Sequence, residues 1–229
     1  MTSVRVVAIA AVAFVLSAQL LAAQELSRYR DYVLESSVAS VVKISSARAS
    51  DIRTLHERPA IIQELAWRAP YMRTGLEQAD PVRDVLFSFY DDQLYRLVVT
   101  YDRDRMDGLT NDDLIESISA TYGVPLLRHA KTAHTPAPLD VPTDTTVVAR
   151  WEDAAALLTL TRGTYSPQLQ LVLISKTLTP RVHTAITEAL RLDKAEAPQR
   201  ELDQREKEIA DARVASQKAR VVNKPAFRP

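Results

Sequence analysis

The spacing of apolar residues near the start of the chain has the period of a helix. In residues 25–49, apolar side chains recur at intervals of three or four, which places them on one helical face. The recurring residues are Leu26, Tyr29, Val33, Val38, Val41 and Val42. The pattern predicts one helix, or two helices with a break near Ser36.

The spacing then changes to a period of two, which is typical of a strand with one buried face. In residues 60–70, the apolar Ile61, Leu65 and Trp67 fall on the same side of an extended chain. We therefore expect a half-buried strand that ends at Pro70.

A second pair of alternating segments lies on either side of Asp91 and Asp92. The alternating residues are Val85, Phe87 and Phe89 before the aspartates, and Tyr95, Leu97, Val99 and Tyr101 after them. Two alternating runs separated by two turn-forming residues predict two strands joined by a tight hairpin.

Residues 101–113 read YDRDRMDGLTNDD and resemble a calcium loop in composition. An EF-hand loop requires an oxygen ligand at its fifth position and glycine at its sixth. Counted from Asp102, the fifth residue is Met106 and the glycine falls at the seventh position, so the spacing excludes an EF-hand. The same stretch favours the start of a helix, with Thr110 as the capping residue and Asp113 as its reciprocal partner.

The second half of the chain repeats the sequence of elements. A helix is predicted after Thr110, with Leu114, Ile115, Ile118 and Tyr122 on one face and Gly123 at its end. Residues 124–146 are rich in proline and threonine and predict a long loop. Three strands are then predicted from Val147, Ala149 and Trp151, from residues 155–163 and from residues 169–176.

These elements predict an α+β fold with an antiparallel sheet built from two repeats. Each repeat contains one helix and three strands, and a tryptophan followed by a charged residue marks the first strand of each. The first repeat covers residues 24–108 and the second covers residues 109–178. We expect both helices to pack against one face of the sheet.

Residues 108–125, GLTNDDLIESISATYGVP, resemble the helix opening of exported outer-membrane assembly modules of the SmpA/OmlA type. The likeness rests on Gly108, Leu109, Thr110, Leu114, Gly123 and Pro125, and Trp151 corresponds to the aromatic strand that follows. The tandem arrangement over residues 30–178 resembles the β-lactamase inhibitor protein. This resemblance implies a doubled helix-and-strand module that binds other proteins.

The N-terminus has the features of a secretory signal peptide. Arg5 precedes an apolar run from Val6, and small residues stand at Ala22 and Ala23. We expect cleavage after Ala23, so residues 1–23 are the signal peptide and the protein is periplasmic or secreted. The alternative is an uncleaved segment that anchors the chain in the inner membrane. We expect no transmembrane helix in the mature chain.

Residues 179–229 differ in character from the repeats. A helix is predicted from Thr179, with an interruption at Pro198 and then a charged, partly disordered tail. No acidic residue follows Asp211, whereas basic residues accumulate. The basic end predicts contact with an acidic partner or with a membrane surface.

The composition excludes several classes of protein. Basic and acidic residues number 29 each, so no net charge attracts nucleic acid. The absence of cysteine excludes disulfides, thiolate metal sites and a lipid-modified N-terminal cysteine. The four glycines form no phosphate-binding loop, and we expect no cofactor.

Histidine and aromatic residues supply the remaining candidate sites. His129 and His134 are weak candidates for a metal site in the long loop, and no catalytic motif is found. The candidates for protein binding are Tyr90, Tyr95, Arg96, Trp67 and Trp151. The two tryptophans fit either core packing or an exposed interface.

Three functions are consistent with the sequence. The first is a non-enzymatic envelope module that binds another protein through a sheet face or the hairpin, in assembly or as an inhibitor. The second is a small periplasmic hydrolase or ligand-binding protein with acidic residues in a cleft of the sheet. The third is a structural envelope protein that interacts through its charged tail.

Overall fold

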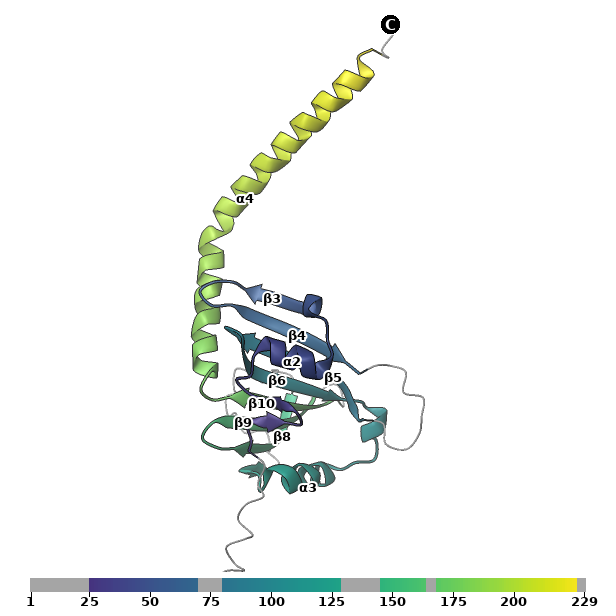
Figure 1. Ribbon diagram of the computed structural model, residues 1–229, viewed down its shortest axis with the longest axis vertical. Coiled ribbons are helices and arrows are strands. Elements are labelled where there is room, and N and C mark those ends of the chain that lie inside the picture. Colours follow the sequence, from purple (N-terminus) through teal and green to yellow (C-terminus); the bar gives the residue numbers. More distant parts are fainter. Residues whose placement is uncertain (1–24, 70–79, 129–144, 164–167, 226–229) are drawn as a thin grey trace, which may run out of the picture. The chain divides into compact units, whose positions relative to one another are not determined.

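The computed structural model describes residues 25–69, 80–128, 145–163 and 168–225. The chain divides into two compact units, one reaching to Val182 and the other beginning at His183. The first unit has an α+β fold, and the second consists mainly of the continuation of a long helix (Figure 1).

Eight strands form one antiparallel sheet in the order β3-β4-β5-β6-β10-β9-β8-β7. They are β3 (Ile52–His56), β4 (Ile62–Arg68), β5 (Val82–Tyr90), β6 (Gln93–Tyr101), β7 (Leu127–Arg128), β8 (Thr145–Glu152), β9 (Ala156–Gly163) and β10 (Leu169–Ser175). Each half of the chain supplies four neighbouring strands that run in chain order from one edge to the middle. The predicted α+β class and antiparallel sheet are confirmed.

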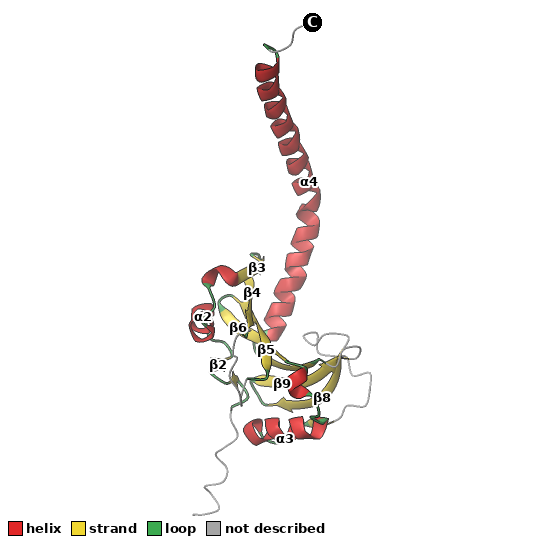
Figure 2. Ribbon diagram, turned by 90° about the vertical axis from the view of Figure 1, so that its right-hand side faces the viewer, coloured by secondary structure: helices red, strands yellow, loops and turns green. Residues whose placement is uncertain are grey.

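One face of the sheet packs against two helices, α2 (Val38–Ser45) and α3 (Asn111–Tyr122) (Figure 2). Val41 of α2 and Leu114 and Ile115 of α3 lie in one buried cluster with side chains from the central strands. Each large apolar side chain buried there contributes about 1.5–3 kcal/mol relative to an exposed one. This cluster is the main core of the first unit.

The opposite face of the sheet has a smaller buried cluster. It contains Val98, Leu157, Val172 and Ile174, with Leu86 packed against it. These residues alternate along their strands with residues of the main core. The central strands are therefore apolar on both faces, which accounts for the nearly continuous apolar run of β10.

The acidic stretch around Thr110 starts α3, as the sequence predicts. The Asp113 backbone N–H donates to Thr110 Oγ1 at 3.2 Å, and the Thr110 N–H donates to Asp113 Oδ2 at 2.8 Å. A hydrogen bond from the Thr110 hydroxyl to the carboxylate, together with the bond from the Thr110 N–H, lowers the pKa of Asp113. Gly123 ends the helix with a φ of 84°, which favours glycine.

The predicted N-terminal helix is wrong in its first half. The chain forms instead a small hairpin of β1 (Arg28–Tyr29) and β2 (Tyr32–Val33). Arg30 and Glu35 have positive φ values of 53° and 66°, which a right-handed helix does not contain. The chain does break where expected, because Ser37 caps α2 through a hydrogen bond from the Ser40 N–H.

Each half of the sheet contains one strand more than the sequence predicts. The additional strands are β3 and β7, which form the two edges. The middle residues of β3 are exposed, and β7 contains only two residues. Neither strand therefore produces the apolar alternation that identifies a half-buried strand.

Two predicted strand faces also require correction. Ile61 precedes β4 and is 47% exposed, whereas Ile62 is 1% exposed. In β8, the pairing with β9 shifts between Val147 and Ala149, so that Val148 and Ala149 are both buried. A β-bulge of this kind interrupts the period of two.

The C-terminal helix α4 (Thr179–Asn223) continues through Pro198, where the sequence predicts an interruption. Proline inside a helix lacks an N–H donor and costs about 3 kcal/mol. Side-chain bonds span this position, since the Arg200 guanidinium donates to the Asp193 carboxylate at 2.9 Å and to its backbone carbonyl at 3.2 Å. Among the described residues, no helix has the length and apolar character needed to cross a membrane.

Replacing Thr110 with alanine removes the side-chain acceptor of the α3 cap. We expect the free energy of unfolding of the Thr110→Ala variant to fall by about 1 kcal/mol, measured by urea denaturation. The matched control is Thr121→Ala, an exposed position near the end of the same helix. An equal loss of stability in both variants would contradict a contribution from the cap.

Candidate protein-binding surface

The five residues predicted to bind a partner do not gather on one surface. Tyr90, Tyr95 and Trp151 are buried, with exposed fractions of 9%, 6% and 1%. Trp67 is partly buried against the main core, and Arg96 is partly buried on the opposite face of the sheet. The two tyrosines are therefore not surface anchors in this structure.

The hairpin turn between β5 and β6 makes hydrogen bonds to other elements of the fold. Asp91 and Asp92 both have positive φ, as a tight two-residue turn requires. The Asp91 carboxylate accepts from the Ile61 N–H at 2.9 Å, and the Asp92 carboxylate accepts from the Val38 N–H at 3.0 Å. The turn thereby joins the start of β4 to the start of α2.

The aromatic side chains near this turn make contacts within the protein. The Arg181 guanidinium lies 5.3 Å from the centre of the Tyr90 ring, at the distance of a cation–π contact. Arg181 belongs to the first turn of α4. The contact therefore links the first turn of α4 to Tyr90 at the end of β5.

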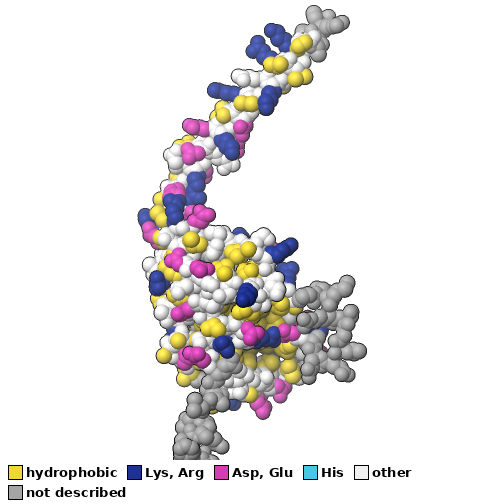
Figure 3. Space-filling model, in the orientation of Figure 1, with side chains coloured by type: hydrophobic (Ala, Val, Ile, Leu, Met, Phe, Trp, Pro, Cys, Tyr) yellow, Lys and Arg dark blue, Asp and Glu magenta, His cyan; other side chains and the backbone are white. Residues whose placement is uncertain are grey.

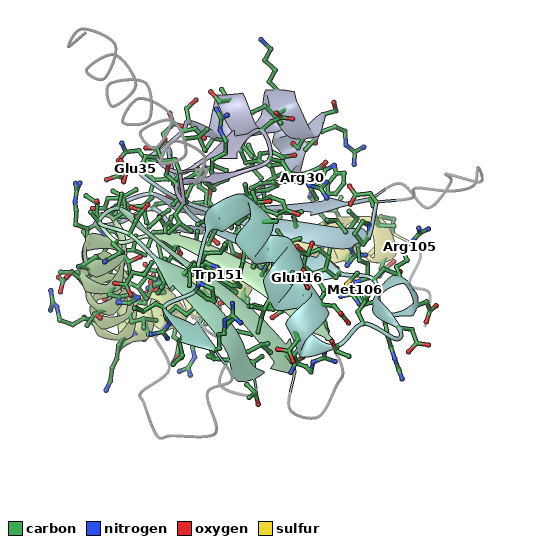
Figure 4. All side chains as sticks on the ribbon, turned by 90° about the horizontal axis from the view of Figure 1, so that it is seen from below. Arg30, Glu35, Arg105, Met106, Glu116 and Trp151 are labelled. Atoms are coloured by element: carbon green, nitrogen blue, oxygen red, sulfur yellow. The ribbon has the colours of Figure 1, made fainter. Side chains whose placement is uncertain are left out.

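Trp151 is part of the core beneath α3 (Figure 4). Its indole Nε1–H donates to the carbonyl of Gly123 at 2.9 Å. A buried indole N–H needs such an acceptor, and here the acceptor is the residue that ends α3. Of the two interpretations of this tryptophan, the structure favours core packing.

Arg96 stands between Ser88 on β5 and Ile174 on β10. Its Nε atom is buried and has no hydrogen-bond partner among the described residues. The Ser88 hydroxyl donates to Glu64 at 3.5 Å in the same row. These side chains form a polar row on the face of the sheet opposite the two helices, and the row does not include the predicted aromatic residues.

A polar cluster that the sequence analysis missed fixes the N-terminal hairpin to the end of the sheet. The guanidinium of Arg30 forms two hydrogen bonds with the carboxylate of Asp80, one of them at 2.8 Å. Asp80 also accepts from the Val82 N–H at 3.1 Å, at the start of β5. The two residues are 50 positions apart, so no local pattern in the sequence could have shown the pairing.

Three tyrosines surround this ion pair. Burial raises the pKa of Tyr29, of Tyr101 and of Tyr122, and brings that of Tyr122 to about 12. The Tyr122 hydroxyl donates to the carbonyl of Arg28 at 3.0 Å. The cluster joins the hairpin, the end of β6 and the last turn of α3, and its contacts are structural.

Among the described residues of the first unit, the two most exposed large apolar side chains lie between α3 and β7. Val124 is 87% exposed, Leu126 is 72% exposed and Leu127 is 37% exposed. Between them, Pro125 is buried. Consecutive apolar side chains in water are typical of a surface that another molecule covers.

This apolar segment lies at an edge of the sheet. The Leu126 N–H donates to the Arg150 carbonyl at 2.7 Å, and Leu127 then pairs with Arg150. Because the Arg150 carbonyl faces β7 and Leu127 lies directly opposite Arg150, the N–H and C=O of Leu127 face β8, and those of Arg128 point away from β8. No described strand pairs with β7 on that side. We call residues 124–128 the β7 edge.

The proline- and threonine-rich composition of residues 124–146 predicts a loop where the structure has the β7 edge. A signal was present, since Leu126 and Leu127 are adjacent leucines that follow a helix-ending glycine and a proline. The prolines and threonines farther along the segment favoured its interpretation as a loop instead.

The weak metal candidates His129 and His134 lie outside the described residues. Within the described ranges, no group of three or more histidine, aspartate or glutamate side chains is arranged to hold a metal ion.

Comparisons with protein-family models, with curated proteins and with solved structures give no match for this chain. The likeness to SmpA/OmlA modules and to the β-lactamase inhibitor protein therefore stays a prediction.

The raised pKa of Tyr122 predicts a loss of stability at alkaline pH. An unfolded tyrosine ionises near pH 10, whereas folded Tyr122 ionises near pH 12. Its contribution is therefore complete below the first value and is lost as the pH rises toward the second. We expect the free energy of unfolding to fall less steeply over this range in Tyr122→Phe, measured by urea denaturation. Identical slopes in the variant and the unmodified protein would contradict this role.

Proposed function

We propose that this protein is an exported, non-enzymatic module of the bacterial cell envelope that binds another protein, in assembly or as an inhibitor. The observation that carries the proposal is the β7 edge, where exposed apolar side chains accompany backbone groups that no described strand pairs. The binding element is this edge, in place of the hairpin residues Tyr90 and Tyr95.

The chemistry of the β7 edge favours an extended segment of the partner. An added strand would bond to the outward-facing N–H and C=O of Arg128 and would extend the sheet by one strand. Val124 and Leu126 would be covered by apolar side chains of the partner. Main-chain bonds supply affinity in this mode of binding, and the apolar contacts supply selectivity.

The order of strands supports the proposal that the fold is a tandem repeat. Each half contains a helix and then strands that run from one edge to the centre, and the halves meet at β6 and β10. In our proposal each repeat consists of a helix and three main strands, with a short edge strand added. The β-lactamase inhibitor protein, which the tandem arrangement resembles, is a protein that binds another protein.

The N-terminal sequence supports export. Residues 1–23 combine a basic start, an apolar run and small residues before the expected cleavage site. The absence of cysteine suits a compartment in which free thiols are oxidised.

Replacing Arg128 with proline tests binding through an added strand. The Arg128 N–H points away from β8, so the Arg128→Pro variant loses an outward-facing donor and keeps the Leu126 bond to Arg150. We expect crosslinking to a partner in envelope extract to fall about tenfold, because both a main-chain bond and the approach of the partner strand are lost. The measurement uses a photoreactive residue at position 124.

Ile61→Ser is the matched control, because Ile61 is also exposed and lies near the opposite edge of the sheet. Crosslinking from position 124 is expected to survive in this variant. If Arg128→Pro stays folded by circular dichroism and crosslinks as well as the control, the β7 edge is not the binding element.

A further inference from the structure

The last part of α4 has a charge pattern unlike the rest of the helix. The described residues 212–225 contain Arg213, Lys218, Arg220 and Lys224 and no aspartate or glutamate. The preceding turns contain both signs of charge, with internal pairs such as Arg191 with Glu188 at 2.7 Å. On the face shown in Figure 3, basic and apolar side chains occupy the far end of the helix, and acidic ones occur only before them.

An apolar stripe follows one face of this segment. Val214, Lys218, Val221 and Val222 occupy positions i, i+4, i+7 and i+8, which share one side of a helix. The three valines are 49%, 75% and 71% exposed. These four residues and Gln217 border one shallow open surface. Valine is a poor helix former, so exposed valines here favour neither the helix nor solubility.

A basic stripe lies beside the apolar one. Arg213, Arg220 and Lys224 occupy positions i, i+7 and i+11, which place them on an adjacent side of the helix. None of the salt bridges among the described residues involves them. Their charges are therefore available to an external anion.

The combination of the two stripes distinguishes among possible ligands. Nucleic acid would neutralise the basic stripe but would leave the valines in water. A bilayer of anionic lipids matches both stripes, because the headgroups attract the cations and the acyl boundary accepts the valines. Lys218, within the apolar stripe, reaches the headgroups with its long side chain.

We propose that residues 212–225 of α4 form an amphipathic segment that lies on the surface of an anionic phospholipid bilayer. Val214, Val221 and Val222 enter the boundary between headgroups and acyl chains, and Arg213, Arg220 and Lys224 contact lipid phosphates. This inference is independent of partner binding at the β7 edge, which lies in the other unit.

Vesicle flotation tests the proposal with the chain that begins at Gln24, which contains every described residue. Vesicles of phosphatidylcholine alone are compared with vesicles of equal parts phosphatidylcholine and phosphatidylglycerol. We expect about tenfold tighter binding to the anionic vesicles at low salt, with most of the difference lost at high salt. No binding, or equal binding to both vesicles, would overturn the proposal.

Two variants and a charge-matched control identify the segment. Replacing Arg213, Arg220 and Lys224 with glutamine, or replacing the three valines with glutamine, should each weaken vesicle binding about tenfold. The control replaces Lys194, Arg205 and Lys207 with glutamine, which removes the same charge from an earlier part of α4, and should change binding less than about twofold.

Circular dichroism establishes that α4 stays helical in each variant. An effect of the control equal to that of the basic-stripe variant would show attraction by overall charge and would overturn the assignment to residues 212–225. Self-association by sedimentation equilibrium that is lost in the valine variant, without vesicle binding, would assign the stripe to a second copy of the chain instead. Duplex DNA binding that exceeds vesicle binding would likewise contradict the proposal.

Discussion

The pairing of β6 with β10 holds the two halves of the first unit together. Five residue pairs join these strands, from Gln170 with Thr100 to Ile174 with Arg96. On one face the shared core includes Leu171 and Val99, and on the other face Val172 meets Val98. Without this pairing, β6 and β10 would each be an edge strand with apolar residues on both faces. The sheet therefore becomes a single core only when residues about 70 positions apart meet, and contacts of such long range slow folding.

The main strands could be predicted from the sequence because the alternation of their large apolar residues reflects burial directly. The segments that became β4, β5, β6, β9 and β10 all carry large apolar or β-branched residues at alternate positions. Failures occur where a distant contact decides the local conformation. Tyr29 has helical spacing, but its burial beside Tyr101 requires a hairpin, and its neighbour Arg30 bonds to Asp80. Local spacing contains no information about partners 50 residues away.

The candidate site was predicted less well than the fold, for a related reason. An aromatic residue in a strand indicates burial or an interface, and sequence alone does not separate the two. Tyr90 and Trp151 proved to be internal, each with a contact to the end or start of a helix. The β7 edge escaped prediction because a strand of two residues has no period. Its identification needed the bond from Leu126 to Arg150, which connects the segment before β7 to β8.

The continuity of α4 past Pro198 has a consequence for distance. A helix rises about 1.5 Å per residue, so the stretch from Pro198 to Asn223 extends for roughly 40 Å. That length is close to the full thickness of a lipid bilayer with its headgroups, about 40–45 Å. The valines near the end of the helix, and any surface that they contact, therefore lie at a fixed distance from Pro198 along the helix axis. The proline, which lacks one backbone bond, is the position where that rod bends most readily.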